Sequence, residues 1–294
     1  QIDLAHLNMG SKGSTFRKLI LTWWAKKVLN LPVVLHLHAS SFDTWFTGLS
    51  ARKKNLIING INRADEILVL GEVWRSKLVG FGVSEKIINK VVMGVPEISK
   101  KIPNLETRSK KIKILFAGEM SVRKGFPELL DAMTEESLSN FELTCVGSGP
   151  VSSWIDYLKS RGSKGNVTFL GLVPVAKVHE LLQQSEILIL PSRAEGLPVS
   201  VMEALSAKTA VVCTTAGALV EYLKDQVNAI VINEVSKIGI VAALEKLQNL
   251  KTRNMVAENG YKLWKANFDV NKTKDTILKE WERVYNSSTG TTGP

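Results

Sequence analysis

The apolar residues of this chain gather in short continuous runs, and longer stretches with apolar residues at helical spacing lie between the runs. Short apolar runs of about four to eight residues are typical of strands that are buried on both faces of a parallel sheet. A chain that alternates such strands with helices predicts an α/β fold built from doubly wound parallel sheets. In chain order, the runs are IDLAHLN, PVVLHLHA, EILVL, KVVMGV, KILFAG, FELTCVG, NVTFLG, EILIL, TAVVCT and AIVI.

A polar stretch without periodicity divides this series in two. It covers residues 97–111, contains Pro103 and has the composition of an interdomain linker. We therefore predict one Rossmann-like domain over residues 1–96 and a second over residues 112–270. An amphipathic helix is expected over residues 271–286, and residues 287–294 are expected to form a disordered tail.

The first long helical pattern, over residues 15–30, combines apolar and basic residues. Its apolar positions include the neighbouring Trp23 and Trp24, and Lys26 and Lys27 follow closely. Tryptophans beside lysines fit a helix at a membrane interface, where the rings prefer the headgroup level and the lysines meet anionic lipid. The same apolar residues also fit a helix that packs its apolar face on a sheet. The sequence leaves both interpretations open.

The composition supports a large α/β protein whose first part is basic. The chain has 294 residues, of which 45% are hydrophobic, enough to form the cores of two domains. No apolar run is long enough to span a bilayer, and the strand-like run that follows Gln1 predicts that no signal peptide is present. The net charge of +10 is uneven, because residues 1–108 hold 16 Lys and Arg against 8 Asp and Glu, whereas residues 109–294 hold 22 against 20. This excess predicts an anionic partner, either a membrane surface or a nucleic acid.

The two cysteines, Cys145 and Cys213, both lie in apolar, strand-like runs. We predict buried and unpaired thiols, which suit a reducing compartment such as the cytoplasm. The four histidines form no cluster with zinc-like spacing, so no metal site is expected.

Two acidic residues, Glu195 and Glu203, lie eight positions apart in PSRAEGLPVSVMEAL, which follows the apolar run EILIL. Pro191 ends the strand and Pro198 suits the first turn of a helix, so Glu195 is expected in the loop and Glu203 in the helix. The unpaired amides at the start of that helix suit a phosphate, and Glu203 could accept hydrogen bonds from hydroxyls such as a ribose diol. On spacing alone, a surface helix with one loop acid and one acid on its exposed stripe explains the same residues.

The stretch EGLPVSVME resembles the E-x7-E signature of family 4 of the retaining glycosyltransferases, which have the GT-B fold. Other stretches resemble further motifs of this family in the family's order and spacing, and the match covers nearly the whole chain. They are HLHASSFD (36–43), LFAGEMSVRKGFPELLDAM (115–133), CVGSGP (145–150) and TTAGALVEYL (214–223). The resemblance implies two Rossmann-like domains that face a cleft, with the final helix crossing back to the first domain.

The resemblance also implies an activity, the transfer of a sugar from a nucleotide diphosphate sugar with retention of the anomeric configuration. The donor is expected to be a UDP- or GDP-sugar, bound as a substrate without cofactor or metal, and the acceptor a glycan or a lipid-linked molecule. Such a reaction serves polysaccharide or glycolipid biosynthesis. The enzyme is expected in the cytoplasm, or bound peripherally to the inner face of the membrane.

The family's motifs, carried over residue by residue, assign roles to individual positions. The expected catalytic residues are Glu195, which would contact the donor sugar, Lys124, which would contact the leaving diphosphate, and His38, which would face the acceptor. Glu203 is expected to bind the ribose, and the other donor-binding positions are Gly118, Glu119, Arg123, Gly147, Gly196, Leu197 and Pro198. Without the resemblance, Lys124 is equally a solvated lysine and His38 a structural histidine.

Two departures from the family's pattern affect the expected activity. Glu119 stands where many members carry an arginine, and a carboxylate at this position would repel a diphosphate. Three explanations are open: Arg123 supplies the missing charge, Glu119 turns away from the site, or the activity is weaker. No strand and glycine-rich loop precede Ile2, so we expect the first domain to be incomplete at its start.

A glycosyltransferase-like binding module without catalytic activity is the alternative function. Glu119 and the absent first loop favour it, whereas Glu195, Glu203 and Lys124 favour an enzyme. A nucleic-acid binder rests on net charge alone, and the basic residues lack the interleaved aromatic platform on which bases stack. We therefore expect no nucleic-acid partner.

Overall fold

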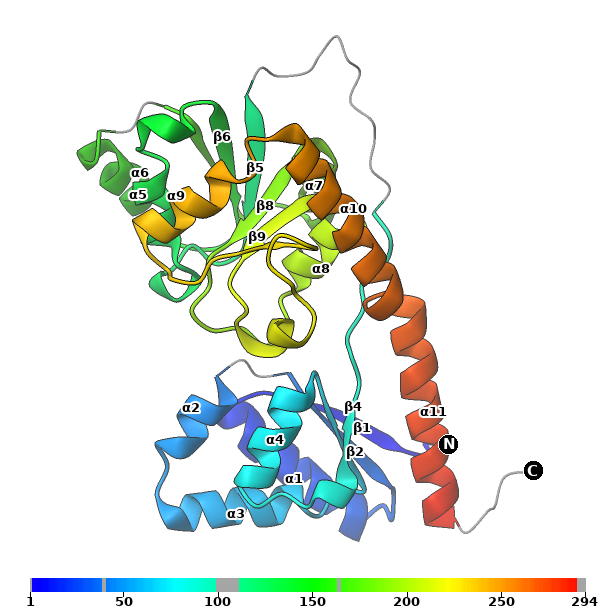
Figure 1. Cartoon of the computed structure of the whole chain (residues 1–294). Coiled ribbons are helices and arrows are strands. Elements are labelled where there is room, and N and C mark those ends of the chain that lie inside the picture. The colour runs from blue at the N-terminus through cyan, green and yellow to red at the C-terminus, as the bar shows by residue number, and fades with distance from the viewer. Residues whose placement is uncertain (1, 39–40, 99–110, 163–164, 290–294) are drawn as a thin grey trace. The chain divides into compact units, whose positions relative to one another are not determined.

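The computed structural model describes residues 2–38, 41–98, 111–162 and 165–289. The chain divides into two units, of which the first comprises Gln1–Gly94, Glu195–Leu197 and Val270–Pro294. The second comprises Val95–Ala194 and Pro198–Asp269. Most of the predicted linker, residues 99–110, lies outside the described residues. Each unit has its own parallel sheet (Figure 1).

The first unit contains a four-stranded sheet in the order β1-β2-β3-β4, and each neighbouring pair of strands is parallel. The strands are Ala5–Met9 (β1), Val33–Leu37 (β2), Glu66–Val69 (β3) and Ile88–Lys90 (β4). All residues of β2 and β3 are buried, as expected for inner strands of a parallel sheet.

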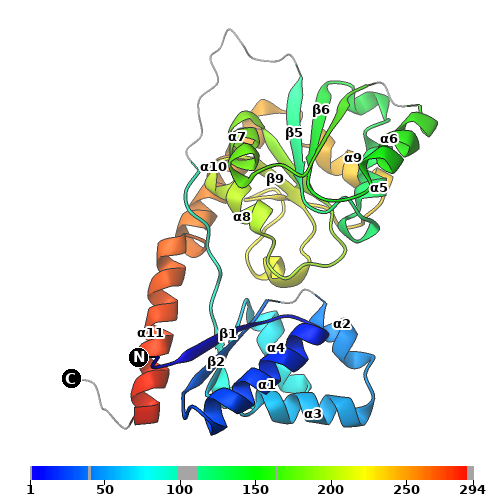
Figure 2. The same cartoon turned by 180° about the vertical axis from the view of Figure 1, so that it is seen from behind.

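The final helix of the chain, Val270–Thr289 (α11), packs against the sheet of the first unit (Figures 1 and 2). Its Ile277 and Val284 contact a cluster of strand residues, Val34, Leu68 and Val91. The helix continues to Thr289, so residues 287–289 of the predicted tail are helical, and residues 290–294 lie outside the described residues. Among the described helices, none is both long and apolar enough to cross a membrane.

The other helices of the first unit follow strands β1, β2 and β3. They are Gly13–Lys27 (α1), Phe42–Thr47 (α2), Ala51–Ile61 (α3) and Glu72–Gly80 (α4), and a short turn of 3-10 helix covers Glu85–Ile87. Helices α1 and α3 lie side by side, as both views show (Figures 1 and 2). They meet where Leu19 packs on Gly60, because a β-carbon added to Gly60 would lie 3.0 Å from Cδ1 of Leu19.

The second unit contains a six-stranded sheet in the order β10-β9-β8-β5-β6-β7, and its neighbouring strands are parallel. The strands are Ile112–Ala117 (β5), Phe141–Val146 (β6), Val167–Gly171 (β7), Ile187–Leu190 (β8), Ala210–Cys213 (β9) and Ile230–Val231 (β10). Strand β5 comes first in the chain yet lies between β6 and β8, so the direction of winding reverses at the β5–β8 pair. This pair is the topological switch point of a doubly wound sheet. The predicted α/β fold, with parallel sheets in two domains, is confirmed.

Helices flank the second sheet (Figure 1). They are Phe126–Ala132 (α5), Val151–Ser160 (α6), Val175–Gln184 (α7), Val199–Ser206 (α8), Lys237–Glu245 (α9) and Leu250–Asn267 (α10). Helix α5 packs against α9, and α8 packs against α10. Neither cysteine forms a disulfide, and both are buried in strands of this sheet, as predicted; burial raises the pKa of Cys145.

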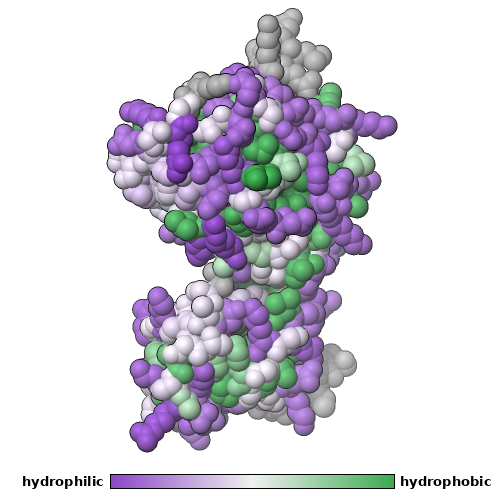
Figure 3. Space-filling model, turned by 60° about the vertical axis from the view of Figure 1, so that its left-hand side comes forward, coloured by the Kyte–Doolittle hydropathy of each residue, from purple (hydrophilic) through white to green (hydrophobic). Residues whose placement is uncertain are grey.

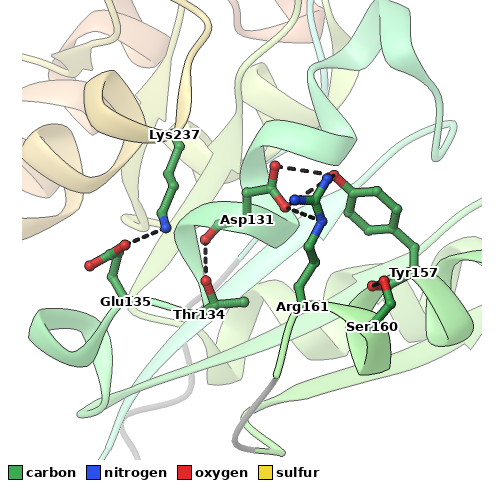
Figure 4. Close-up of polar contacts among 7 residues, drawn as sticks. All are labelled: Asp131, Thr134, Glu135, Tyr157, Ser160, Arg161 and Lys237. Carbon is green, nitrogen blue, oxygen red and sulfur yellow. Dashed lines mark hydrogen bonds and ion pairs between the residues drawn. The ribbon is translucent and has the colours of Figure 1, made fainter.

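A polar cluster ties α5 to α6 (Figure 4). The hydroxyl of Tyr157 lies 3.0 and 3.1 Å from the two carboxylate oxygens of Asp131. Arg161, which follows α6, stacks on the Tyr157 ring at 4.9 Å and lies 3.6 Å from Oδ1 of Asp131. Burial and the adjacent carboxylate raise the pKa of Tyr157, so its hydroxyl keeps the proton that it donates. An ion pair between Lys237 and Glu135 ties the start of α9 to the same region. These contacts tie the carboxyl end of α5 to α6 and to the start of α9.

Candidate functional site

The loops at the carboxyl ends of β5 and β8 come together at the switch point of the second unit. Ligands of open α/β sheets bind outside the carboxyl ends of the strands at this point. The β5–α5 loop covers residues 118–125, and the β8–α8 loop covers residues 191–198. Most of the predicted donor-binding residues therefore lie in these two loops, as the motif positions implied.

The first part of the site is a bare backbone surface made by Gly118 and Gly147. The amide of Gly118 donates to the carbonyl of Val146 at 3.0 Å. Gly147 has a φ of +133°, and a β-carbon added there would lie 1.9 Å from the carbonyl oxygen of Gly118. Only glycine tolerates both the backbone conformation and this close approach. The two predicted glycines thus lie against each other after β5 and β6.

Lys124 lies next to this surface. It ends a turn of 3-10 helix, Val122–Lys124, and α5 begins at Phe126. Between them, Gly125 has a φ of +66°, and a β-carbon added there would lie 2.1 Å from the carbonyl oxygen of Pro191. This contact holds the β5–α5 loop against the start of the β8–α8 loop. Lys124 is half-buried, and its Cε lies 3.9 Å from the position of a β-carbon on Gly118.

Arg123 links Glu119 to the β8–α8 loop. Its Nη2 lies 2.9 Å from Oε2 of Glu119, and its Nη1 donates to the carbonyl of Ala194 at 3.1 Å. The acidic departure from the family's pattern is therefore compensated by the neighbouring arginine. Because Arg123 forms an ion pair with Glu119, its positive charge is partly offset and does not add in full to that of Lys124.

The sequence did not identify Arg193, which also links the two loops. Its Nη1 donates to the carbonyl of Val122 at 2.6 Å, and its Nη2 lies 2.7 Å from Oε1 of Glu128 on α5. Hydrogen bonding to Glu128 raises the pKa of Arg193, so the guanidinium stays charged. The carboxylate partner is 65 positions away in the chain, and the only available signal was a basic residue beside the acidic motif.

Glu203 lies inside α8, as predicted, and contacts a residue that the sequence did not single out. Its Oε1 lies 3.0 Å from Nε2 of His179 on α7, and its side chain is largely buried. Pro198 takes the cap position before α8, and the first helical hydrogen bonds run from the amides of Val201 and Met202 to its carbonyl. The amides of the two preceding helical residues therefore precede the hydrogen-bonded ladder, where an anion can bind.

His38 belongs to the first unit and follows β2. Its Nε2 lies 2.9 Å from Oδ1 of Asn8, and its ring centre lies 4.0 Å from that of His36. Burial and the nearby His6 lower the pKa of His38. Because the Asn8 oxygen can only accept a hydrogen bond, Nε2 of the neutral ring carries the proton and Nδ1 is left as an acceptor.

The predicted residues are thus divided between the two units. The second unit contains Gly118, Glu119, Arg123, Lys124, Gly147, Pro198 and Glu203, whereas His38, Glu195, Gly196 and Leu197 are assigned to the first. Glu195 lies in the loop between β8 and α8, as predicted, and is buried. Within the described part of the chain, no group of three His, Cys, Asp or Glu residues is arranged to hold a metal ion.

Solved structures resemble this chain over nearly its whole length. The chain aligns with Anabaena HepE in complex with UDP and glucose at a TM-score of 0.79, with 17% identity, over 94% of this chain and 77% of that one. It aligns with sucrose-phosphate synthase of Thermosynechococcus elongatus at a TM-score of 0.83, with 14% identity, over 97% of this chain and 74% of that one. At these identities the likeness concerns the fold, which is the two-domain fold of glycosyltransferases.

Curated relatives match parts of longer proteins. The glycosyltransferase MJ1607 of Methanocaldococcus jannaschii is 29% identical over 177 residues, which is 58% of this chain and 44% of that protein. A Bacillus subtilis protein named for teichuronic acid biosynthesis, the glycosyltransferase TuaC, is 26% identical over 273 residues, which is 88% of this chain and 66% of that protein. The chain thus spans roughly half to two thirds of these relatives.

The family model described as glycosyl transferases group 1 matches residues 97–263, more than half of the chain. The matched region holds β5 to β10 and both loops of the switch point. Together with the two parallel sheets and the site at the switch point of the second one, this match shows that the chain belongs to the glycosyl transferases group 1 family.

Proposed function

We propose that the chain is part of a retaining glycosyltransferase of family 4 that takes its sugar from a UDP- or GDP-sugar. The observation that carries the proposal is a bare backbone surface, made by Gly118 and Gly147, with Lys124 beside it at the switch point. A diphosphate suits this arrangement, because the lack of side chains on both glycines leaves room for its oxygens and the lysine balances its charge. The likeness to a protein that binds UDP and glucose supports this class of donor.

The chemistry requires positive charge where the leaving group gains negative charge. As the bond between the sugar and the diphosphate breaks, the electron pair stays on the diphosphate. Lys124 and the amides at the start of α8 are the groups proposed to stabilise that charge. The proposed step requires no cofactor. The links that Arg123 and Arg193 make between the two loops keep these groups in place before the donor binds.

We assign the ribose of the donor to Glu203, whose carboxylate can accept hydrogen bonds from both ribose hydroxyls. The hydrogen bond between Nε2 of His179 and Oε1 of Glu203 fixes the orientation of this carboxylate, so we assign His179 as a positioning residue. Glu195 is assigned to the hydroxyls of the donor sugar, and Gly196 to Pro198 to the sugar or its phosphate. His38, with Nδ1 as an acceptor, is assigned to the incoming hydroxyl of the acceptor.

The acceptor is proposed to be a glycan or a lipid-linked molecule in polysaccharide or glycolipid biosynthesis. Relatives named for teichuronic acid and amylovoran biosynthesis support this class of acceptor. A cytoplasmic enzyme that works at the inner face of the membrane fits such an acceptor.

A comparison of UDP with 2′-deoxy-UDP tests the ribose assignment by isothermal titration calorimetry. The wild type should prefer the ribonucleotide by about tenfold, because one hydrogen bond to a charged group is lost in the deoxynucleotide. Glu203→Gln should remove most of this preference, and His179→Ala part of it. The matched control is Glu245→Gln, an exposed acid on α9 of the same unit. An unchanged preference in Glu203→Gln would show that the ribose binds elsewhere.

Turnover separates the enzyme from the non-catalytic module. Full-length protein is incubated with UDP-, GDP- and ADP-sugars and a membrane extract, and the release of nucleotide is followed. We expect release from one donor class, with an α-linked product from an α-linked donor. Tight nucleotide binding with no release under any of these conditions would favour the binding module.

A further inference from the structure

Helix α1 buries its small residues and exposes its large apolar ones. The buried positions of α1 are Thr15, Thr22 and Ala25. By contrast, Ile20, Trp23 and Trp24 are 66%, 47% and 45% exposed. The interpretation of α1 as an ordinary helix that packs its large apolar side chains on the sheet is therefore wrong. Gly60 of α3 lets the two helices lie close together, because Leu19 of α1 packs on it.

The exposed residues form one continuous face. Arg17, Ile20, Trp24 and Lys27 follow one another at spacings of three, four and three, so they lie on a single stripe along the helix. Stripes on either side carry further large apolar residues. The apolar members of this face, called here the α1 face, are Phe16, Ile20, Leu21, Trp23, Trp24, Val28 and Leu29.

The neighbouring helix α3 extends this face. Leu56 is 61% exposed and lies one turn before Gly60, on the side of α3 that meets α1. Arg52 and Lys53, in the turn before Leu56, are also exposed. Hydrophobic side chains of the second unit, in contrast, are scattered among hydrophilic ones on the surface that Figure 3 shows.

The charge around the α1 face is almost entirely positive. Residues 12–65 hold nine Lys and Arg against two acids, Asp43 and Asp65. Both carboxylates form ion pairs, Asp43 with Lys77 of α4 and Asp65 with Lys26 of α1. An exposed face with seven large apolar residues marks an interaction surface, and the cations around it favour an anionic partner.

Three partners could cover this face: a second copy of the chain, a nucleic acid or a lipid bilayer. Two copies of the chain related by a two-fold axis would place the same cations against each other, which is unfavourable. A nucleic acid would use the cations but leave Ile20, Leu21 and Val28 without a role. We propose that the α1 face, with Leu56 of α3, docks the protein on an anionic lipid bilayer. The tryptophan rings enter the headgroup region, the aliphatic residues reach the acyl boundary, and the cations meet anionic headgroups.

Co-sedimentation with vesicles tests this docking and requires neither donor nor acceptor, so it can fail independently of the proposed activity. The chain is mixed with vesicles of pure phosphatidylcholine, or of phosphatidylcholine with about 30% phosphatidylglycerol. We expect binding to the anionic vesicles only. Trp23→Gln with Trp24→Gln, and separately Arg17→Glu with Lys27→Glu, should each weaken this binding about tenfold or more.

Two control pairs carry matched changes outside the α1 face. Ile238→Gln with Leu172→Gln changes two apolar residues of the second unit that are 81% and 80% exposed. Lys274→Glu with Lys279→Glu reverses two exposed charges on α11. Both pairs should bind anionic vesicles like the wild type, and thermal melting should show that all four variants fold.

Three results would overturn the docking proposal. The first is wild-type protein that stays in the supernatant with anionic vesicles. The second is tryptophan or charge variants that bind as tightly as their controls. The third is a concentration-dependent dimer in sedimentation velocity that the tryptophan variant abolishes, since a second copy would then be the occupant.

Discussion

The guanidinium of Arg123 lies 2.9 Å from the carboxylate of Glu119, four residues earlier in the chain, and also binds the carbonyl of Ala194. A residue that would repel a diphosphate is thereby paired within the β5–α5 loop and joined through Arg123 to Ala194 of the β8–α8 loop. The charges of Arg123 and Glu119 offset each other, so the net charge that this loop presents to a donor depends on both side chains.

Changing one member of this pair should therefore alter nucleotide affinity in a direction that depends on which is changed. Glu119→Gln releases the charge of Arg123 and should tighten UDP binding, whereas Arg123→Ala leaves Glu119 uncompensated and should weaken it. Because both side chains are partly exposed, we expect changes of about fivefold or less. Calorimetric titration with UDP measures them, and Lys177→Ala, which removes an exposed ion pair on α7, is the control. Changes of the same sign in the two variants, or no change in either, would contradict the role given to the pair.

Lys124→Ala should lower kcat by about a hundredfold while the fold stays intact, because the lysine contact strengthens as charge develops on the leaving diphosphate. Lys262→Ala, an exposed lysine on α10, provides the control. Donor turnover and thermal melting are measured for each variant. Near wild-type kcat and KM in Lys124→Ala would show that the diphosphate lies elsewhere.

Gly147→Ala should destabilise the second unit by more than about 2 kcal/mol, since its β-carbon would collide with backbone and force the loops apart. The control is Gly162→Ala, also at positive φ (+73°) but with no atom within 4 Å of its β-carbon position. Urea unfolding of both variants separates the close contact from the backbone conformation. Equal losses in the two variants would mean that contact with Gly118 contributes nothing.

His36 should make the first unit sensitive to acid. Burial, together with the neighbouring His38 and His6, lowers its pKa from 6.5 to about 3. Below pH 6.5 the unfolded chain binds a proton that the native chain does not, so stability falls as the pH drops towards 3, by up to about 1.4 kcal/mol per pH unit.

His36→Gln removes the imidazole that binds this proton. The other titrating groups contribute nearly equally to the pH dependence of both proteins, so their contributions largely cancel when the two are compared. The free energy of unfolding of the wild type, measured relative to the variant, should fall by about 2 kcal/mol between about pH 7.5 and about pH 5. Urea unfolding at both pH values provides the measurement. Parallel pH curves for the two proteins would show that His36 titrates normally in the native state.

The sequence by itself determined most strands of both units and the position of the acidic motif. The run KVVMGV is the exception, because β4 covers Ile88–Lys90 and overlaps it only at Lys90. Strands β8 and β9 fall within EILIL and TAVVCT, because strands covered on both faces require continuous apolar runs. Pro191 and Pro198 bracket the loop that holds Glu195, since neither residue can continue a regular ladder, and Glu203 lies in the helix that follows.

Only the tertiary structure decided which side chains meet at the site. Glu119 is held by Arg123, Arg193 by Glu128, and Glu203 by His179, and the last two pairs join separate elements. The spacing within one segment carries no information about the partner that another segment brings to it. Strand order, which places β5 between β6 and β8, decides these meetings.

The burial of α1 was decided in the same way. Helical periodicity groups Ile20 with Trp24 and Thr15 with Thr22, but it does not say which group faces inward. Contacts with β1 and α3 decide the inward side, where Thr15, Thr22 and Ala25 are buried and Leu19 packs on Gly60. Ile20 and Trp24 on the opposite side face outward, against the preference that hydrophobicity alone predicts.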